Sequence, residues 1–200
     1  PPRSTLFPYT TLFRSQALQV IDTFSRYQIK KIITQCPHCF NTFKNDYPDL
    51  GGHYEVFHHT SFLNGLMKEG RLKVKSSVSG SGLLTYHDPC YLGRGNGVYQ
   101  DPRSVLEMAG YSPVEMKRSG SFAWCCGAGG AQMFKESEPG HTEVYAERTR
   151  EALDTGAGVI ATACPFCMTM LSDGIKKAGE EERVINLDIA EILAEKLGLL

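Results

Sequence analysis

The sequence predicts an α/β fold built around a parallel, Rossmann-like sheet with cysteine-rich loops. Short runs rich in Val, Ile and Thr alternate with stretches of helical periodicity, which is typical of strand–helix–strand units and a parallel sheet. Cysteines follow several of the predicted strands, and in parallel sheets ligand-binding residues gather beyond the carboxyl ends of the strands. We therefore expect the functional site at the edge of the sheet where the parallel strands end.

Two of the predicted strands, residues 30–34 and 158–162, lead directly into a Cys-Pro-x-Cys motif. Pro37 and Pro165 suit the first turn of a following helix, where the missing N–H costs nothing. We expect each cysteine pair at a helix N-terminus, where the helix dipole and free N–H groups favour thiolates. Further strands are predicted at residues 83–86, 113–117 and 183–187, and helices at residues 102–109, 143–155, 167–177 and 188–197.

Residues 34–72 resemble residues 162–200 at a constant offset of 128 positions, which indicates an internal duplication. Thr60 and Asp188 occupy the same place in the two copies, and each is expected to cap an apolar-periodic helix. Because further cysteines precede the second copy, we expect the first copy to lack its front half. The predicted division is a tail of the first copy at 16–75, a Ser- and Gly-rich linker at 76–82, and a complete second domain at 83–200.

Residues 1–15 fit neither copy. Thr-Leu-Phe occurs at residues 5–7 and again at residues 11–13, with no period leading into the domain. The stretch resembles translated sequencing-adaptor sequence, so we expect it to be non-native and leave it out of the fold prediction.

Composition excludes several classes of function. A net charge of −1 with no basic stretch argues against nucleic-acid binding. No run reaches the roughly 18–20 apolar residues of a membrane span, so we expect no membrane contact by this fragment. Seven cysteines is an odd number, which argues against a secreted disulfide framework and favours metal binding in the cytoplasm.

Five cysteines form one spaced set, the five-cysteine group: Cys90, Cys125, Cys126, Cys164 and Cys167. The intervals are 34 residues from Cys90 to the vicinal pair and 37 residues from that pair to Cys164. Tetrahedral zinc rarely needs five thiolates, whereas iron–sulfur clusters are held by cysteine thiolates. Gly127 follows the vicinal pair, and we expect backbone N–H groups there to approach the sulfurs. The set predicts an iron–sulfur site, with zinc left as the rival metal.

Three segments carry a family resemblance: His-Asp-Pro-Cys-Tyr-Leu-Gly-Arg at 87–94, Cys-Cys-Gly-Ala-Gly-Gly at 125–130, and Ala-Cys-Pro-Phe-Cys at 163–167. They resemble the cysteine-rich CCG domain, which occurs in the B-type component of heterodisulfide reductase, in iron–sulfur subunits of glycolate and lactate oxidases, and in oxidoreductases that accept electrons from electron-transfer flavoprotein. The resemblance covers nearly everything from residue 16 onward. The sequence around residues 58–59 and 87–94 most resembles the last group.

The resemblance implies a non-cubane [4Fe-4S] cluster on the five-cysteine group, with Cys36 and Cys39 contributing to a second cluster. It implies an iron–sulfur oxidoreductase that passes electrons from electron-transfer flavoprotein, or another redox subunit, toward quinone. Quinone would be reached through the missing part of the chain, at the cytoplasmic face of the membrane. The fragment alone is expected to be inactive.

Alternatives remain open from the residues. The chain could be a zinc-binding structural or docking module, part of a heterodisulfide reductase or of a glycolate/lactate oxidase, or a thiol–disulfide enzyme using Cys36 and Cys39. A second set of residues has both a functional and a structural interpretation. His58 and His59 could face a quinone or donor path, but we expect them at the surface. His87 and Asp88 precede Cys90 and could support that ligand, or His87 could be a core histidine. Arg94 could offset cluster charge or pair with a surface acid, and Trp124 is expected to pack rather than to relay electrons.

Overall fold

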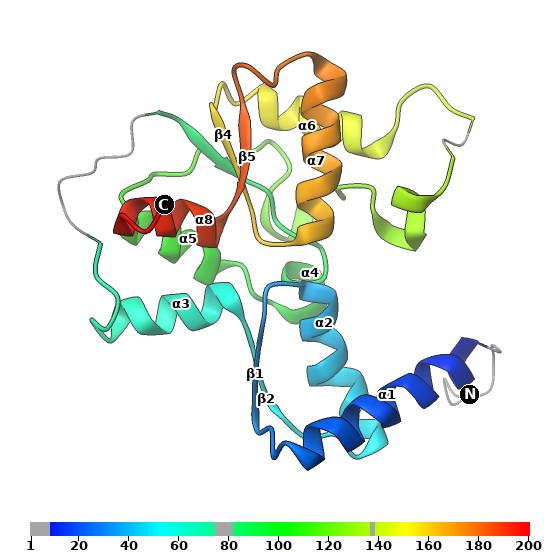
Figure 1. Cartoon of the computed structure of the whole chain (residues 1–200). Coiled ribbons are helices and arrows are strands. Elements are labelled where there is room, and N and C mark those ends of the chain that lie inside the picture. Colours follow the sequence, from blue (N-terminus) through cyan, green and yellow to red (C-terminus); the bar gives the residue numbers. More distant parts are fainter. Residues whose placement is uncertain (1–8, 75–81, 137–138) are drawn as a thin grey trace.

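The computed structural model describes residues 9–74, 82–136 and 139–200 and confirms an α/β fold with parallel strands. One sheet pairs two strands, and a separate sheet has three strands in the order β3–β4–β5 (Figure 1). All pairings are parallel. The strands are β1 Lys31–Thr34, β2 Glu55–His58, β3 Leu84–Tyr86, β4 Val159–Thr162 and β5 Ile185–Asp188.

Helices follow most strands, as expected for repeated strand–helix units. A π-helical turn at Thr42–Asp46 and 3-10 turns at Tyr47–Leu50, Gly120–Phe122 and Gly129–Phe134 fill some of the connections. None of the helices in the described ranges is both long and apolar enough to cross a membrane. The α-helices are α1 Tyr9–Arg26, α2 Pro37–Asn41, α3 His59–Lys68, α4 Gly93–Asn96, α5 Gln100–Met108, α6 Val144–Leu153, α7 Pro165–Ala178 and α8 Ile189–Leu197.

Local sequence explains where these helices begin and end. Cys36 and Cys164 have extended backbone and stand immediately before α2 and α7, each with a proline in the first helical turn. Asp188 begins α8 with a capping box that includes the Glu191 side chain. Gly179, with φ of 70°, ends α7 in the left-handed conformation that glycine adopts without cost.

The second half of the proposed repeat departs from the constant offset. Thr34 and Thr162 lie 128 positions apart, but their strand partners, His58 and Asp188, lie 130 positions apart. His58, not Thr60, precedes α3, and the prediction that Thr60 caps this helix is therefore wrong. The reason lies in the connections, since α2 stops at Asn41 and gives way to other turns, whereas α7 continues to Ala178.

The strand predicted at residues 113–117 is also wrong. In the described part of the chain, only Val114 forms a bridge there, to Thr85. The Val114 N–H donates to the Leu84 carbonyl and the Val114 carbonyl accepts from the Thr85 hydroxyl, both at 2.7 Å, and the pairing does not extend beyond this residue. Further on, the Arg118 N–H donates to Glu151 on α6, which draws the backbone away from the sheet.

The two sheets share one hydrophobic core. Phe40 and Met67 pack in the same group as Leu84, Leu106 and Ile192, which belong to the second segment. Helices α3, α5 and α8 pack against one another between the sheets (Figure 1). Residues 16–74 therefore lie directly against the following segment, and their origin as the tail of a duplicated domain stays a prediction.

Two predicted segments fall wholly or partly outside the described ranges. Of the linker at 76–82, only Gly82 is described. Of residues 1–15, the structure describes 9–15. These residues are helical, and α1 runs from Tyr9 past the boundary expected after residue 15 without a break. Side chains of residues 12–16 are exposed and Ala17 is the first buried one. The non-native origin of this segment stays a prediction.

Candidate metal centre

The structure brings the five-cysteine group together at the carboxyl ends of β3 and β4. Cys90 follows β3, Cys164 follows β4, and Cys167 lies in the first turn of α7. Cys125 and Cys126 come from the loop between two 3-10 turns. Each thiol shifts the pKa of the next along the series Cys90, Cys125, Cys126, Cys167 and Cys164, so the five lie next to one another. None of these cysteines is in a disulfide.

The thiols perturb one another strongly. Hydrogen bonds from Cys126 and Cys90 hold the pKa of Cys125 far below its usual value. The hydrogen bond from Cys167, aided by His38, lowers the pKa of Cys164 to about 5 despite burial. Their hydrogen-bond partners shift the other way, and the pKa of Cys126 rises to about 12 because of Cys125. Thiols whose pKa values are lowered beside other thiols suit metal cations, which bind thiolates and displace their protons.

Backbone N–H groups approach the same sulfurs. The Gly127 N–H donates to Cys125 Sγ at 3.3 Å, and backbone donors at Ala128 and Cys167 reach Cys126 and Cys164. Gly127 has φ of 89°, and a Cβ there would lie 3.1 Å from the Tyr145 nitrogen. Only glycine suits both constraints. The approach of N–H groups to sulfur is as expected, and contact of Gly127 with a cofactor stays a prediction.

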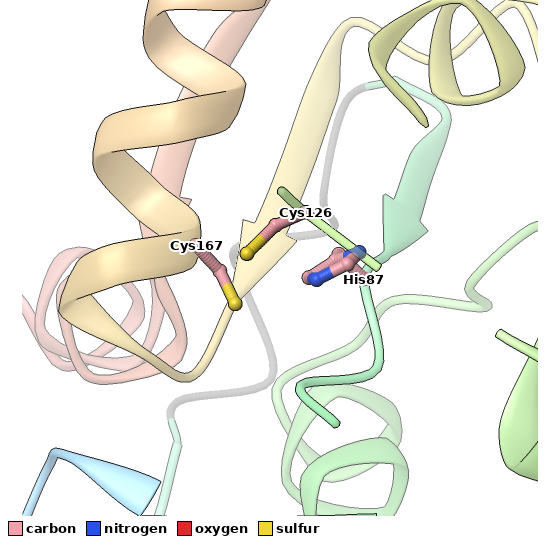
Figure 2. Close-up of side chains that lie close together, drawn as sticks. All are labelled: His87, Cys126 and Cys167. Atoms are coloured by element: carbon pink, nitrogen blue, oxygen red, sulfur yellow. The ribbon is translucent and has the colours of Figure 1, made fainter. Parts of the chain in front are cut away.

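His87 is buried beside the five-cysteine group. One of its ring nitrogens and the sulfurs of Cys126 and Cys167 all lie within 4.8 Å of one another (Figure 2). Arg148 Nε donates to His87 Nδ1 at 2.9 Å. Burial, then the Arg148 charge, lowers the pKa of His87 to about 3, so the ring is neutral. Sequence reasoning missed Arg148, because an arginine within a polar helical stretch is normally exposed.

Asp88 joins the loops that carry the cysteines. It accepts two hydrogen bonds from Arg103, at 2.7 and 2.9 Å, and one from the Gly120 N–H at 2.8 Å. Cys90 and the vicinal pair are therefore tied through one buried carboxylate. The role of Asp88 visible in this structure is to fasten these loops.

Cys36 and Cys39 lie beside the five-cysteine group rather than far from it. His38 provides the link, because it approaches Cys36 Sγ at 3.9 Å and also hydrogen-bonds Cys164. These bonds, the one to Cys164 first, raise the pKa of His38 to about 9. Its ring stacks against Tyr91 at 4.2 Å between centroids. The sequence pattern gave no reason to single out His38.

The structure also shows where the other residues near the motifs lie. His58 and His59 are buried, which corrects the expectation of surface histidines. His58 contacts the Thr60 hydroxyl at 2.7 Å, and His59 Nε2 lies 2.9 Å from Asp188 at the junction of the two sheets' helices. Trp124 packs under the Arg118 guanidinium, at 4.1 Å from its ring centroid, which is the packing role expected for it.

Arg94 carries charge toward the thiols. Its positive charge opposes the rise in the pKa of Cys90, which is caused first by the hydrogen bond to Cys125 and then by burial. No ion pair to a surface acid is found for Arg94 within residues 9–74, 82–136 and 139–200. The charge-offsetting interpretation of Arg94 fits this placement better than the surface-pair interpretation.

Comparison with known proteins gives a family and several relatives. The family model described as the CCG cysteine-rich domain matches residues 6–44 and 84–172. The EtfAB:quinone oxidoreductase of Syntrophomonas wolfei is 42% identical over 188 residues, covering 91% of this chain and 26% of the relative. The probable iron–sulfur-binding oxidoreductase FadF of Bacillus subtilis is 43% identical over 187 residues, covering 93% and 26%.

A third relative comes from a different kind of complex. A component of the dihydromethanophenazine:CoB–CoM heterodisulfide reductase of Methanosarcina barkeri is 39% identical over 191 residues, covering 93% of this chain and 45% of that relative. The chain therefore spans between about a quarter and under half of the length of these relatives.

Proposed function

The chain belongs to the CCG cysteine-rich domain family, and on that premise we propose that it is the iron–sulfur electron-transfer part of a larger oxidoreductase. The observation that carries this proposal is the convergence of five thiols, from three distant segments, on one pocket at the carboxyl ends of β3 and β4. In the complete protein, electrons would pass from electron-transfer flavoprotein, or another redox subunit, toward quinone. The name of the Syntrophomonas relative supports this direction.

The residues present fit an iron–sulfur cluster. Five soft thiol ligands suit iron–sulfur chemistry, and neighbouring thiols lower the pKa of Cys125 and of Cys164, which favours the thiolate form that binds metal. The buried Nε2 of His87 has no hydrogen-bond partner among the described residues, as expected beside a pocket that holds a sulfur-rich group. We propose a [4Fe-4S] cluster of the non-cubane type, held by Cys90, Cys125, Cys126, Cys164 and Cys167.

When bound, the cluster supplies one-electron redox chemistry, and the chain controls its surroundings. Cys126, Cys164 and Cys167 are buried, which keeps water from most of the pocket. Cys90 and Cys125 are partly exposed, and this side would face the redox partner. N–H groups at Gly127 and at the start of α7 would stabilise negative charge on sulfur.

We also propose that Cys36 and Cys39 are ligands of a second cluster. They stand at the start of α2 as Cys164 and Cys167 stand at the start of α7. The sequence holds no further cysteine for this site, so its other ligands would come from elsewhere. His38 bridges the two cysteine sites, and the short separation would suit electron exchange between them.

Location follows from the proposed partners rather than from the chain itself. Quinone lies in membranes and electron-transfer flavoprotein is soluble, so the protein would work at the cytoplasmic face of a membrane. This chain on its own would not complete the transfer of electrons to quinone, because it spans only part of its relatives.

A zinc-binding structural module is the second candidate. It is favoured by the short separation of the His87 ring from Cys126 and Cys167, since zinc takes nitrogen and sulfur ligands. Structural zinc is closed by four ligands, however, and the pocket offers five cysteines. A third candidate function is a role within a heterodisulfide reductase, which the Methanosarcina relative favours.

The test is reduction of the anaerobically purified protein by reduced electron-transfer flavoprotein, followed by visible absorbance in a stopped-flow instrument. We expect rapid bleaching, its loss in Cys126→Ser, and its retention in His53→Leu, which removes an exposed histidine. A colourless protein would refute the iron–sulfur proposal. Bleaching by dithionite but never by the flavoprotein would refute the proposed donor alone.

A further inference from the structure

His87 stands between a buried arginine and the five-cysteine group. It follows β3, and its backbone N–H donates to the Ala161 carbonyl on β4 at 3.0 Å, which fixes its position at the sheet edge. Its side chain is 1% exposed. Figure 2 shows the ring beside the sulfurs of Cys126 and Cys167, which come from a loop and from α7.

Arg148 fixes which ring nitrogen of His87 carries the proton. A guanidinium has only donors, and Arg148 Nε donates to Nδ1 at 2.9 Å, so Nδ1 must offer a lone pair. The guanidinium itself is held in place by the Arg118 carbonyl at 2.8 Å and by Glu151 at 2.9 Å. A neutral ring with its lone pair at Nδ1 carries its hydrogen at Nε2.

The Nε2–H group has no acceptor among the described residues, although it is buried. Buried donors are almost always paired in native proteins. Nδ1 is held on the Arg148 side, and the ring lies beside the thiol pocket, so the free nitrogen is the one available to that pocket. The natural acceptor there is anionic sulfur.

We propose that His87 donates its Nε2–H to a sulfur atom of the group bound by the five cysteines, and that it is a positioning residue rather than a ligand. This inference rests on the proposed iron–sulfur function. The Nε2 lone pair is absent in this tautomer, so His87 cannot bind metal through Nε2 while Arg148 holds Nδ1. The same geometry argues against a zinc site made by His87, Cys126 and Cys167.

The donated hydrogen bond favours the reduced form. Reduction adds negative charge to the sulfurs, and an N–H donor stabilises that charge more in the reduced state than in the oxidised state. In His87→Leu, we expect the ratio of reduced to oxidised protein against a redox dye to fall about tenfold, which is about 59 mV for one electron. His87→Gln keeps an N–H donor and should recover part of that shift.

The experiment combines this titration with pulsed EPR on the anaerobically purified full chain, grown with ¹⁵N-histidine. The expected wild-type spectrum has an exchangeable proton coupling that disappears in D₂O and in His87→Leu, with only weak nitrogen coupling. His53→Leu removes an exposed histidine and is the matched control, expected to change neither measurement.

The outcomes separate the inference from the function on which it rests. A strong nitrogen coupling, as from a direct histidine ligand, would overturn the inference, as would a wild-type spectrum with no coupling to ¹⁵N-histidine at all. These two readings need no variant, so misfolding of His87→Leu would not leave the question open. Wild-type protein without iron would instead refute the proposed function and with it this inference.

Discussion

Gly174 allows helices α6 and α7 to lie in close contact, and its replacement by alanine should separate them. A Cβ at this position would lie 1.9 Å from Thr149 Oγ1 and 2.8 Å from Thr149 Cβ. Rotation of the hydroxyl cannot relieve the second contact, so a helix must move. Helix α6 carries Arg148 and α7 carries Cys167, which makes this packing a condition for the metal pocket.

The expected loss follows from two opposing effects. Overpacking a tight core contact costs about 1–3 kcal/mol. Alanine regains about 0.5–1 kcal/mol of helix propensity relative to glycine. Gly174→Ala should therefore lower the free energy of unfolding by about 1–2 kcal/mol. Gly65→Ala in α3 is the matched control, because no atom lies within 4 Å of the new Cβ, and it should stabilise by about 0.5–1 kcal/mol.

Urea unfolding of the two variants, and of Gly174→Ala combined with Thr149→Ala, measures these effects. The double variant removes Thr149 Oγ1 and Cγ2 but keeps Thr149 Cβ, so it should still be less destabilised than the sum of the single variants, by at least about 0.5 kcal/mol. The reasoning would be refuted if Gly174→Ala were as stable as Gly65→Ala, or if the two substitutions were additive.

Three further predictions concern the pocket and its supports. Asp88→Asn breaks the buried pair with Arg103 and should cost about 3–5 kcal/mol in urea unfolding, so a loss below about 0.5 kcal/mol would contradict it. Burial is the first cause that lowers the pKa of His58 and of His87 to about 3, below the value of about 6.5 in the unfolded chain. Each neutral ring therefore stabilises the fold above pH 6.5, and this stabilisation is lost as pH falls toward 3. Each should remove about 2 kcal/mol between pH 8 and pH 5, and His58→Gln should roughly halve the total slope, whereas an unchanged slope would argue against a neutral buried His58. In metal-free folded protein, a thiol reagent should label the partly exposed Cys125 before Cys39, because hydrogen bonds lower the pKa of Cys125 whereas burial first raises the pKa of Cys39 to about 11. Mass spectrometry that found Cys39 labelled first would oppose this prediction.

Much of the fold could be predicted from the sequence because local signals agreed with the tertiary structure. The strands before Cys36 and Cys164 are apolar runs ended by proline-initiated helices, and both occur as predicted. Since parallel strands present their carboxyl ends at one edge, the convergence of the cysteines also followed from the fold class.

The failures have equally specific causes. The strand expected at 113–117 has the right composition, but only Val114 pairs with the sheet, and the Arg118 N–H further on donates to Glu151 on α6. The shift from Thr60 to His58 as the residue before α3 depends on how α2 ends, which a comparison of residue identities cannot reveal. Hydroxyl geometry and helix length are settled by tertiary contacts.

The supports of the site could not be predicted for a related reason. Arg148 is fully buried because Glu151, His87 and the Arg118 carbonyl all accept from it, and the last two lie 61 and 30 positions away in the sequence. His38 gains its importance only because the first segment packs against α7. Single-residue patterns carry no information about such long-range pairs.

The content of iron, acid-labile sulfide and zinc in anaerobically purified protein tests the central claim most directly. For one [4Fe-4S] cluster on the five-cysteine group we expect about four irons and an equivalent amount of sulfide per chain, both lost in Cys125→Ser. About one zinc per chain, with neither iron nor sulfide, would contradict the electron-transfer account and leave a zinc-stabilised module in its place.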